Sequence, residues 1–198
     1  GEFYESGKPV MVCRKGLRAG GSASACRALT NDGLFTIREL DAGTIGVIPI
    51  MSSSRDEATD RFFTIRKTLR ACGMVPAKGD DEEAAEVLPD GVGGEYRSTK
   101  SLAGGGVIQL QDSQGHKLEL RILPAIRRAA VGYTGGGGFL DESDLWPNDP
   151  ELHVNPAGQV IRDVMKRFTT QPTARLYVFS ASYHARSAHS ERVDMGDT

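Results

Sequence analysis

Two short segments of this chain combine residue types that can handle phosphate. One is the glycine-rich segment 15–22, KGLRAGGS, which directly follows the apolar run 10–13. The other is the acidic pair Asp141-Glu142, which follows Phe139 and Leu140. A glycine-rich turn between a strand and a helix offers backbone N–H groups to phosphate oxygens. Paired carboxylates can hold a magnesium ion and polarise a water molecule. Together the two segments predict hydrolysis of ATP.

The glycine-rich segment departs from the usual phosphate-loop pattern, G-x-x-x-x-G-K-[ST]. Gly20 and Ser22 stand at their usual places, but Gly21 occupies the lysine position and Lys15 occupies that of the first glycine. We expect Lys15 to reach back across the loop to the phosphates and Arg18 to add a second positive charge. Ser22 is expected to ligate magnesium. A glycine-rich turn beside a surface lysine remains the alternative interpretation.

The acid pair and a later pair of hydroxyls extend the predicted site. We expect Asp141 to organise the magnesium ion and Glu142 to activate the attacking water. Ser180 and Ser182 follow the apolar run 176–179, where small hydroxyl side chains can sense the γ-phosphate. Acid pairs are also common in loops, and the serines also suit an ordinary turn at a strand end.

The elements that must position these residues alternate between strands and helices. Apolar residues at 58, 62, 65, 69 and 72 predict an amphipathic helix over 55–72, capped by Ser54 or Asp56. Asn155 is expected to cap a helix over 156–168. The other predicted elements are a helix over 22–29, strands at 10–13, 43–51, 139–140 and 175–179, a strand pair at 107–110 and 118–122, and a solvated excursion over 77–94. This alternation predicts a three-layer α/β fold around a mainly parallel central sheet, with ligands at the carboxyl ends of its strands.

Length and composition limit the possible classes of protein. The chain has 198 residues, 39% of them hydrophobic and 25% charged, which suits one globular domain. A net charge of -2 gives no overall basic field that would indicate a nucleic acid. The three cysteines form no CxxC pair, which makes a zinc site improbable and predicts a reduced, intracellular protein. No apolar run approaches the roughly 20 residues that a membrane span needs.

The two ends of the chain lead us to expect a domain cut from a longer protein. The chain begins Gly1-Glu2-Phe3 without a methionine. We interpret residues 1–3 as a cloning scar and residues 4–192 as the ATPase domain.

The glycine-rich segment, the acid pair and the triplet 180–182, in this order, resemble the ATPase domain of the viral terminase large subunit. This enzyme is the motor that packages DNA into procapsids. Lys15, Arg18, Gly20 and Ser22 match the K-x-x-R-x-G-x-S loop of its lambda-like members. The segments 48–72 and 106–122 resemble the family's next strand and helix and the strand pair before its acidic motif. The chain departs from the family at the glycines 135–138, which replace much of a longer apolar strand.

The resemblance implies a P-loop NTPase of the ASCE type with ATP and Mg²⁺ as cofactors. The implied partners are double-stranded DNA, the portal protein, the small terminase subunit and further copies of the chain in a ring, with no membrane involved. The implied location is the host cell cytoplasm, and the family's nuclease domain is absent from this chain. Glu142 would be the catalytic glutamate, and Arg127 or Arg128 would enter a neighbouring subunit's site as an arginine finger. The nucleotide-binding residues would be Lys15, Gly16, Arg18, Gly20, Gly21, Ser22, Ser180 and Ser182, and the metal ligands would be Ser22 and Asp141.

Two other functions fit parts of the pattern. Asp141-Glu142-Ser143-Asp144 with the triplet 180–182 also suits the first motor domain of a DExx helicase, although such domains normally keep the loop lysine that Gly21 replaces. A chain without that lysine could also be a degenerate, non-hydrolysing interaction module.

Overall fold

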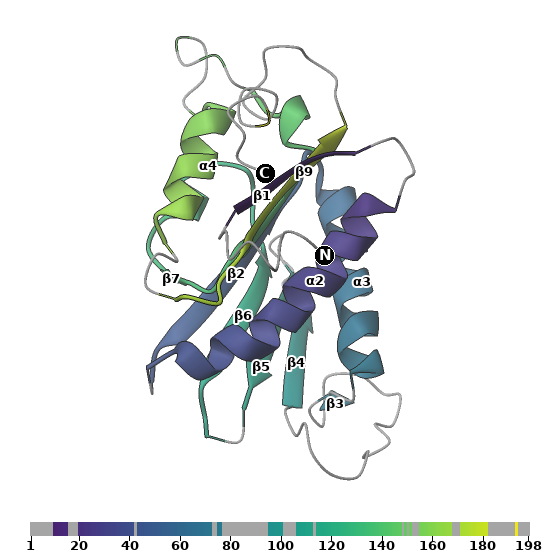
Figure 1. Ribbon diagram of the computed structural model, residues 1–198, viewed down its shortest axis with the longest axis vertical. Coiled ribbons are helices and arrows are strands. Elements are labelled where there is room, and N and C mark those ends of the chain that lie inside the picture. Colours follow the sequence, from purple (N-terminus) through teal and green to yellow (C-terminus); the bar gives the residue numbers. More distant parts are fainter. Residues whose placement is uncertain are drawn as a thin grey trace.

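A central sheet with helices on both faces forms the fold (Figure 1). The computed structural model describes residues 10–15, 20–41, 43–72, 75–76, 95–100, 106–112, 114–147, 149, 151, 155–167, 171–181 and 193. Its strands are β1 Val10–Lys15, β2 Ile45–Met51, β3 Val75–Pro76, β4 Glu95–Lys100, β5 Gly106–Gln111, β6 Lys117–Ile122, β7 Thr134–Gly135, β8 Gly138–Asp141 and β9 Leu176–Ala181. Its α-helices are α2 Gly21–Thr36, α3 Arg55–Ala71 and α4 Ala157–Met165, and its 3₁₀ helices are η1 Ile37–Glu39, η2 Arg127–Ala130 and η3 Ser143–Leu145.

The strand order differs from the order of the chain. Across the described sheet it runs β1-β9-β8-β2-β6-β5-β4-β3, with β7 also beside β2. In this sheet order, the strands β1, β9, β8, β2 and β6 pair with their neighbours in parallel. The pairs β6–β5 and β5–β4 are antiparallel. The mainly parallel sheet and the strand pair before the acidic segment are therefore confirmed. Because β9 lies between β1 and β8 and pairs in parallel with both, the carboxyl ends of these three strands meet at one edge of the sheet.

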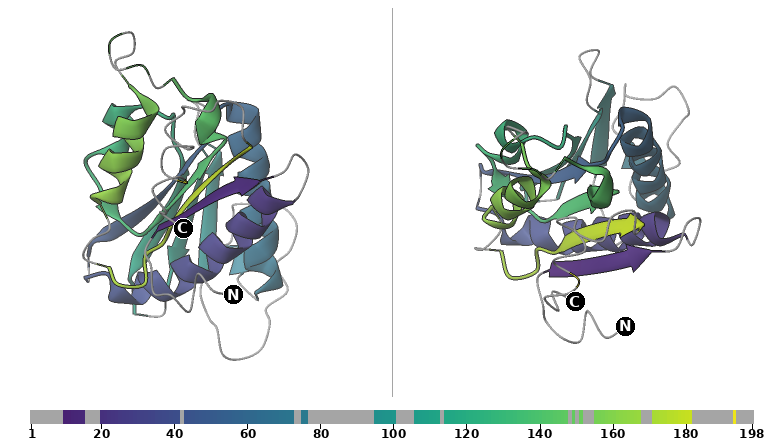
Figure 2. Two further views of the ribbon diagram at one scale, coloured as in Figure 1. Left: turned by 45° about the horizontal axis from the view of Figure 1, so that its top comes forward. Right: turned by 90° about the horizontal axis from the view of Figure 1, so that it is seen from above.

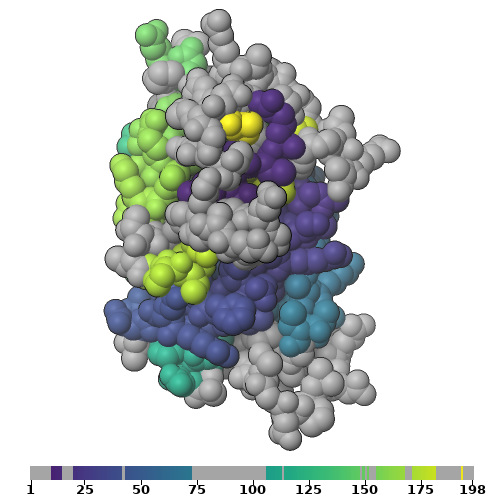
Figure 3. Space-filling model, viewed as in Figure 1, coloured from purple at the N-terminus to yellow at the C-terminus, as the bar shows by residue number. Residues whose placement is uncertain are grey.

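Three layers result from the way side chains alternate along the strands. In β9, Tyr177 and Phe179 belong to the apolar cluster shared with α2 and α3, while Leu176 and Val178 belong to the cluster around α4. Figures 1 and 2 show α4 on one side of the sheet and α2 with α3 on the other. In the space-filling view α2 lies across the viewed face beside α3 (Figure 3). The predicted three-layer arrangement is confirmed at this level.

The two later helices begin for different reasons. The side chain of Ser54 accepts a hydrogen bond from the Glu57 backbone N–H at 3.2 Å, so that Ser54, and not Asp56, caps α3. The prediction that Asn155 caps the next helix is wrong. Pro156 precedes the first residue of α4, and the Asn155 side chain instead accepts from the Arg127 backbone N–H at 2.9 Å.

The helix α2 is longer than its sequence pattern predicts, ending at Thr36 and not at Leu29. The added turns contain polar residues that find partners inside the molecule. Thr30 donates to the Cys26 carbonyl at 2.7 Å, and the Tyr177 hydroxyl donates to Asp32 at 2.5 Å. Burial raises the pKa of Asp32, although the bond from Tyr177 and the charge of Arg175 oppose that shift.

The strand that leads to the acid pair is interrupted by the glycine run. Both β7 and β8 pair with β2, but Val47 to Ile50 on β2 faces the longer stretch from Gly135 to Phe139. One extra residue is therefore accommodated, as in a β-bulge. Gly137 lies there with φ of 120°, and a Cβ atom on it would come within 2.7 Å of the Arg175 carbonyl oxygen. The close approach of Arg175 explains why glycine stands here in place of an apolar residue. The strand line continues from β7 to β8 despite the break.

Some predictions lie outside the described residues, among them the excursion 77–94. Within the part of the chain that the structure describes, no helix combines the length and apolar character needed to cross a bilayer.

Candidate functional site

The start of α2 carries the first side chain of the candidate site. Gly20, with φ of 71°, lies immediately before the helix, in a left-handed conformation that glycine adopts readily. No side chain caps this helix start and no acidic residue lies in its first turn. The partial positive charge that the helix dipole places at this end is therefore not compensated by a carboxylate within that turn. Ser22 lies in this turn and is buried, with 7% of its surface exposed.

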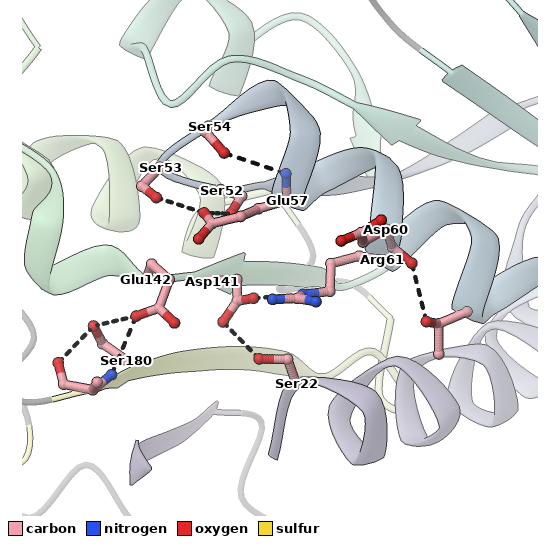
Figure 4. A network of polar contacts seen from close by, with 12 residues as sticks. Ser22, Ser52, Ser53, Ser54, Glu57, Asp60, Arg61, Asp141, Glu142 and Ser180 are labelled. Carbon is pink, nitrogen blue, oxygen red and sulfur yellow. Dashed lines mark hydrogen bonds and ion pairs between the residues drawn. The ribbon is translucent and has the colours of Figure 1, made fainter. Parts of the chain in front are cut away.

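The end of β8 carries the second side chain. Asp141 is the last residue of the strand and its exposed fraction is 0%. Its Oδ1 accepts a hydrogen bond from the Ser22 hydroxyl at 3.1 Å, across 119 positions of sequence. Its Oδ2 lies 2.7 Å from Nε of Arg61 on α3 (Figure 4). Three elements thus converge on one buried carboxylate.

Glu142 directly follows the strand in an unusual backbone conformation. Its φ of 51° is the one positive value among the described non-glycine residues. Such a conformation costs roughly 1 kcal/mol or more in a residue with a Cβ and is common at functional sites. It turns the side chain toward β9, where Oε2 accepts from the Ala181 backbone N–H at 3.3 Å and the Ser180 hydroxyl at 3.4 Å.

Ser180 contacts both sides of the turn that contains Glu142. It is fully buried in β9, and its Oγ accepts a hydrogen bond from the Asp144 backbone N–H at 3.1 Å. The same hydroxyl is within reach of the Ala181 carbonyl at 2.9 Å as well as of Glu142. The position and contacts of Ser180 therefore depend on where Glu142 and the start of η3 lie.

Arg61 is a site residue that the sequence interpretation missed. Its guanidinium is mostly buried, with 21% of the side chain exposed. Burial alone lowers the pKa of Arg61, but the hydrogen bond and charge of Asp141 outweigh it and the pKa is raised. A signal was present in the sequence. Arg61 lies three residues after Ala58 and four before Ile65, on the buried face of α3, so that a partner for a buried charge was needed.

A second polar group lies at the carboxyl end of β2, next to the start of α3. Oε2 of Glu57 accepts hydrogen bonds from the hydroxyls of Ser52 at 2.9 Å and Ser53 at 2.6 Å. Figure 4 shows this group beside the Asp141 contacts, one helical turn before Arg61. A cavity of about 630 Å³ adjoins it, lined in part by Ser52, Arg121 and Trp146.

The structure brings together Ser22, Asp141, Glu142 and Ser180, as the sequence analysis expected of one site. It does not place Arg127 in this group. Arg127 lies on η2, where its Nε contacts Asp163 of α4 at 3.0 Å, and about half of its side chain is exposed. Arg128 is exposed on the same 3₁₀ helix. An arginine finger acts on a neighbouring subunit, and the structure contains a single chain. The role of Arg127 or Arg128 as an arginine finger therefore stays a prediction.

The predicted cations of the loop lie beyond what is described. Lys15 is the last residue of β1, and its backbone pairs with Ala181. The side chain of Lys15 is not among the parts of the chain that the structure describes. Gly16, Arg18 and Ser182 also lie outside the described residues.

The donor set suits a magnesium ion that is shared with phosphates. Mg²⁺ prefers oxygen ligands and, in nucleotide sites, takes only one or two carboxylates together with water and phosphate. The Ser22 hydroxyl and the Asp141 carboxylate, 3.1 Å apart, offer oxygens of this kind. Among the described residues no cluster of three or more His, Cys, Asp or Glu side chains is arranged to hold a metal.

Comparison with models of known protein families and with curated protein sequences finds no match for this chain. The contacts of Asp141 and the residue pattern of the glycine-rich segment are therefore the grounds on which a function can be assigned.

Proposed function

We propose that this chain is the ATPase motor domain of a viral terminase large subunit, a P-loop NTPase of the ASCE type that couples ATP hydrolysis to packaging of double-stranded DNA. The observation that carries the proposal is the hydrogen bond between Ser22 and Asp141. A helix that follows a glycine-rich loop and a strand that ends in two acids are brought to one point by the fold. ATP hydrolases use this pairing of a hydroxyl and a carboxylate to hold Mg²⁺ against the β- and γ-phosphates.

The residues of the chain have separate roles in the proposed reaction. The start of α2, with Gly20 and Gly21, presents backbone N–H groups to phosphate, and Lys15 and Arg18 neutralise its charge. Ser22 and Asp141 would hold Mg²⁺, which would supply Lewis-acid stabilisation of the charge on the transferred phosphoryl group. Glu142, beside Asp141 but directed toward β9, polarises the attacking water.

The DNA-packaging part of the proposal is supported by the resemblance of Lys15, Arg18, Gly20 and Ser22 to the terminase loop. The portal protein, the small terminase subunit and a ring of identical subunits are the partners that this proposal implies. In such a ring, Arg127 or Arg128 would supply the trans charge.

Magnesium-dependent binding of a fluorescent ATP analogue tests the proposal at its central contact. Ser22→Ala is expected to weaken binding by at least about tenfold, which corresponds to roughly 1.4 kcal/mol. Ser24→Ala is the matched control, because Ser24 is exposed in the first turns of the same helix. Unchanged affinity is expected for this control. Absence of nucleotide binding in the wild type, or equal affinities in the two variants, would contradict the proposal.

Assays on the complete protein and its assembly separate the two other functions. A helicase domain, within its full protein, would unwind a DNA duplex in an ATP-dependent manner, which a packaging motor does not require. A non-hydrolysing module would bind ATP and release no phosphate even in the assembled particle. Phosphate release and DNA packaging by the complete motor therefore distinguish the three.

A further inference from the structure

We propose that, in the absence of nucleotide, the guanidinium of Arg61 occupies the place beside Asp141 that a divalent cation takes. Arg61 leaves this carboxylate when the metal binds. The inference rests on the proposed function and adds to it a positioning residue from α3. It starts from the contact of Arg61 Nε with Asp141 Oδ2 at 2.7 Å.

The first argument is charge balance. The Asp141 side chain is completely buried, and a buried carboxylate is very costly unless a cation or several donors compensate it. Arg61 supplies a full positive charge there, because a guanidinium stays protonated at any ordinary pH. Arg61 therefore provides, before any metal arrives, the positive charge that a bound cation would supply at this carboxylate.

The second argument is that the metal and Arg61 would both place positive charge at the same carboxylate. The Ser22 hydroxyl donates to Oδ1 of Asp141, and Arg61 donates to Oδ2. A magnesium ion at this place would be held by oxygen lone pairs of Ser22 and Asp141. A guanidinium within a few ångströms of that ion would be strongly repelled. Binding of the metal therefore favours a conformation in which Arg61 has moved away.

The third argument is that α3 offers Arg61 a second acceptor. Glu57 lies one turn earlier on the same helix, and its charge already raises the pKa of Arg61. A glutamate four residues before an arginine is a favourable helical pair. Glu57 also accepts hydrogen bonds from Ser52 and Ser53 at the end of β2. A shift of Arg61 from Asp141 to Glu57 would change the charge next to this serine segment. Binding of the metal would in this way affect the start of α3.

Titration with Mn²⁺ in the presence of a non-hydrolysable ATP analogue, followed by electron paramagnetic resonance, tests the inference. Arg61→Gln removes the competing charge and is expected to tighten Mn²⁺ binding about tenfold, comparable to one charge-assisted hydrogen bond. Lys67→Gln removes a positive charge from an exposed position of the same helix and should leave the affinity unchanged. Arg61→Lys keeps the charge without the planar fork and should give an intermediate affinity.

The outcomes separate failure of the inference from failure of the proposed function. Lack of metal–nucleotide binding by the wild type would contradict the proposed function and the inference together. Wild-type binding with equal or weaker Mn²⁺ affinity in Arg61→Gln would contradict only the inference. Loss of ATP affinity with unchanged metal affinity would likewise overturn it and make Arg61 a phosphate contact.

A second measurement covers the case in which Arg61→Gln does not fold well. The rise in melting temperature on adding Mn²⁺ and the analogue is compared between the wild type and Arg61→Lys. A larger rise in the variant supports competition between the arginine and the metal. An equal or smaller rise contradicts it, because a purely structural ion pair would lower both melting temperatures alike.

Discussion

Replacement of Glu142 by glutamine separates the proposed catalytic role of this residue from its structural role. The substitution keeps the shape of the side chain and one carbonyl oxygen. That oxygen can still accept from the Ala181 N–H and the Ser180 hydroxyl, which lie 3.3 and 3.4 Å from Oε2 of Glu142. What disappears is the negative charge that would polarise the attacking water.

The structure indicates a small effect on stability and a large effect on turnover. Hydrogen bonds to a charged group contribute about 1.5–3 kcal/mol and neutral ones about 0.5–1.5 kcal/mol. Because both contacts of Glu142 are long, we expect a loss of roughly 1 kcal/mol in total, or about 2–4 °C in melting temperature for a chain of this size. Loss of a general base lowers turnover by about 10²–10⁴-fold.

Phosphate release by the proposed motor, in its complete assembly and at saturating ATP, measures turnover, and binding of an ATP analogue measures ground-state affinity. We expect retained binding with turnover reduced by at least about 100-fold. Glu119→Gln is the matched control, because Glu119 has the same 8% exposure as Glu142 but contacts Gln109 and Arg121 on the antiparallel side of the sheet. Turnover by the Glu142 variant equal to that of the control would exclude Glu142 as the proposed general base.

Three further predictions concern charge and burial. Lys15→Ala should weaken ATP affinity in the binding assay, and unchanged affinity would assign Lys15 to the surface. Burial raises the pKa of Tyr133 to about 12 and its hydroxyl has no partner among the described residues, so Tyr133→Phe should stabilise the protein by up to about 1 kcal/mol in thermal unfolding. Burial also raises the pKa of Asp32 above 3.8, so its favourable contribution is complete at lower pH and is lost as pH rises through the folded-state pKa. The melting temperature of Asp32→Asn relative to wild type should therefore increase from about pH 4 to neutral pH, and a constant difference would contradict this reasoning.

Local patterns predicted the elements that carry the site because those elements bury continuous apolar surface. The periodicity of Ala58, Phe62, Ile65 and Leu69 is enough to define α3, and the apolar runs define β1, β2 and β9. Ser22 and Asp141 were each identified as site residues from local sequence, but their direct contact depends on the fold.

Features that depend on contacts between distant segments were not predictable in the same way. Gly137 replaces an apolar residue because the Arg175 backbone approaches it, a contact that no local pattern contains. In the part of α2 beyond Thr30, the buried Asp32 has its partner in Tyr177, which stands 145 residues later in the chain. Arg61 was overlooked because a charged residue in an amphipathic helix is normally interpreted as part of the solvated face.

The insertion of β9 between β1 and β8 gives Ser180 its place in the proposed motor. Ser180 pairs in register with Arg14 of β1 on one side, and its neighbour Phe179 pairs with Asp141 of β8 on the other. Its buried hydroxyl contacts both Glu142 and the Asp144 backbone N–H. In the proposed mechanism Glu142 would leave β9 to orient a water, and this hydroxyl would then lose one partner and keep its contact with the start of η3. Through Ser180 the strand order would thus connect Glu142, the proposed catalytic residue, to a turn at the surface, since Leu145 at the end of η3 is exposed.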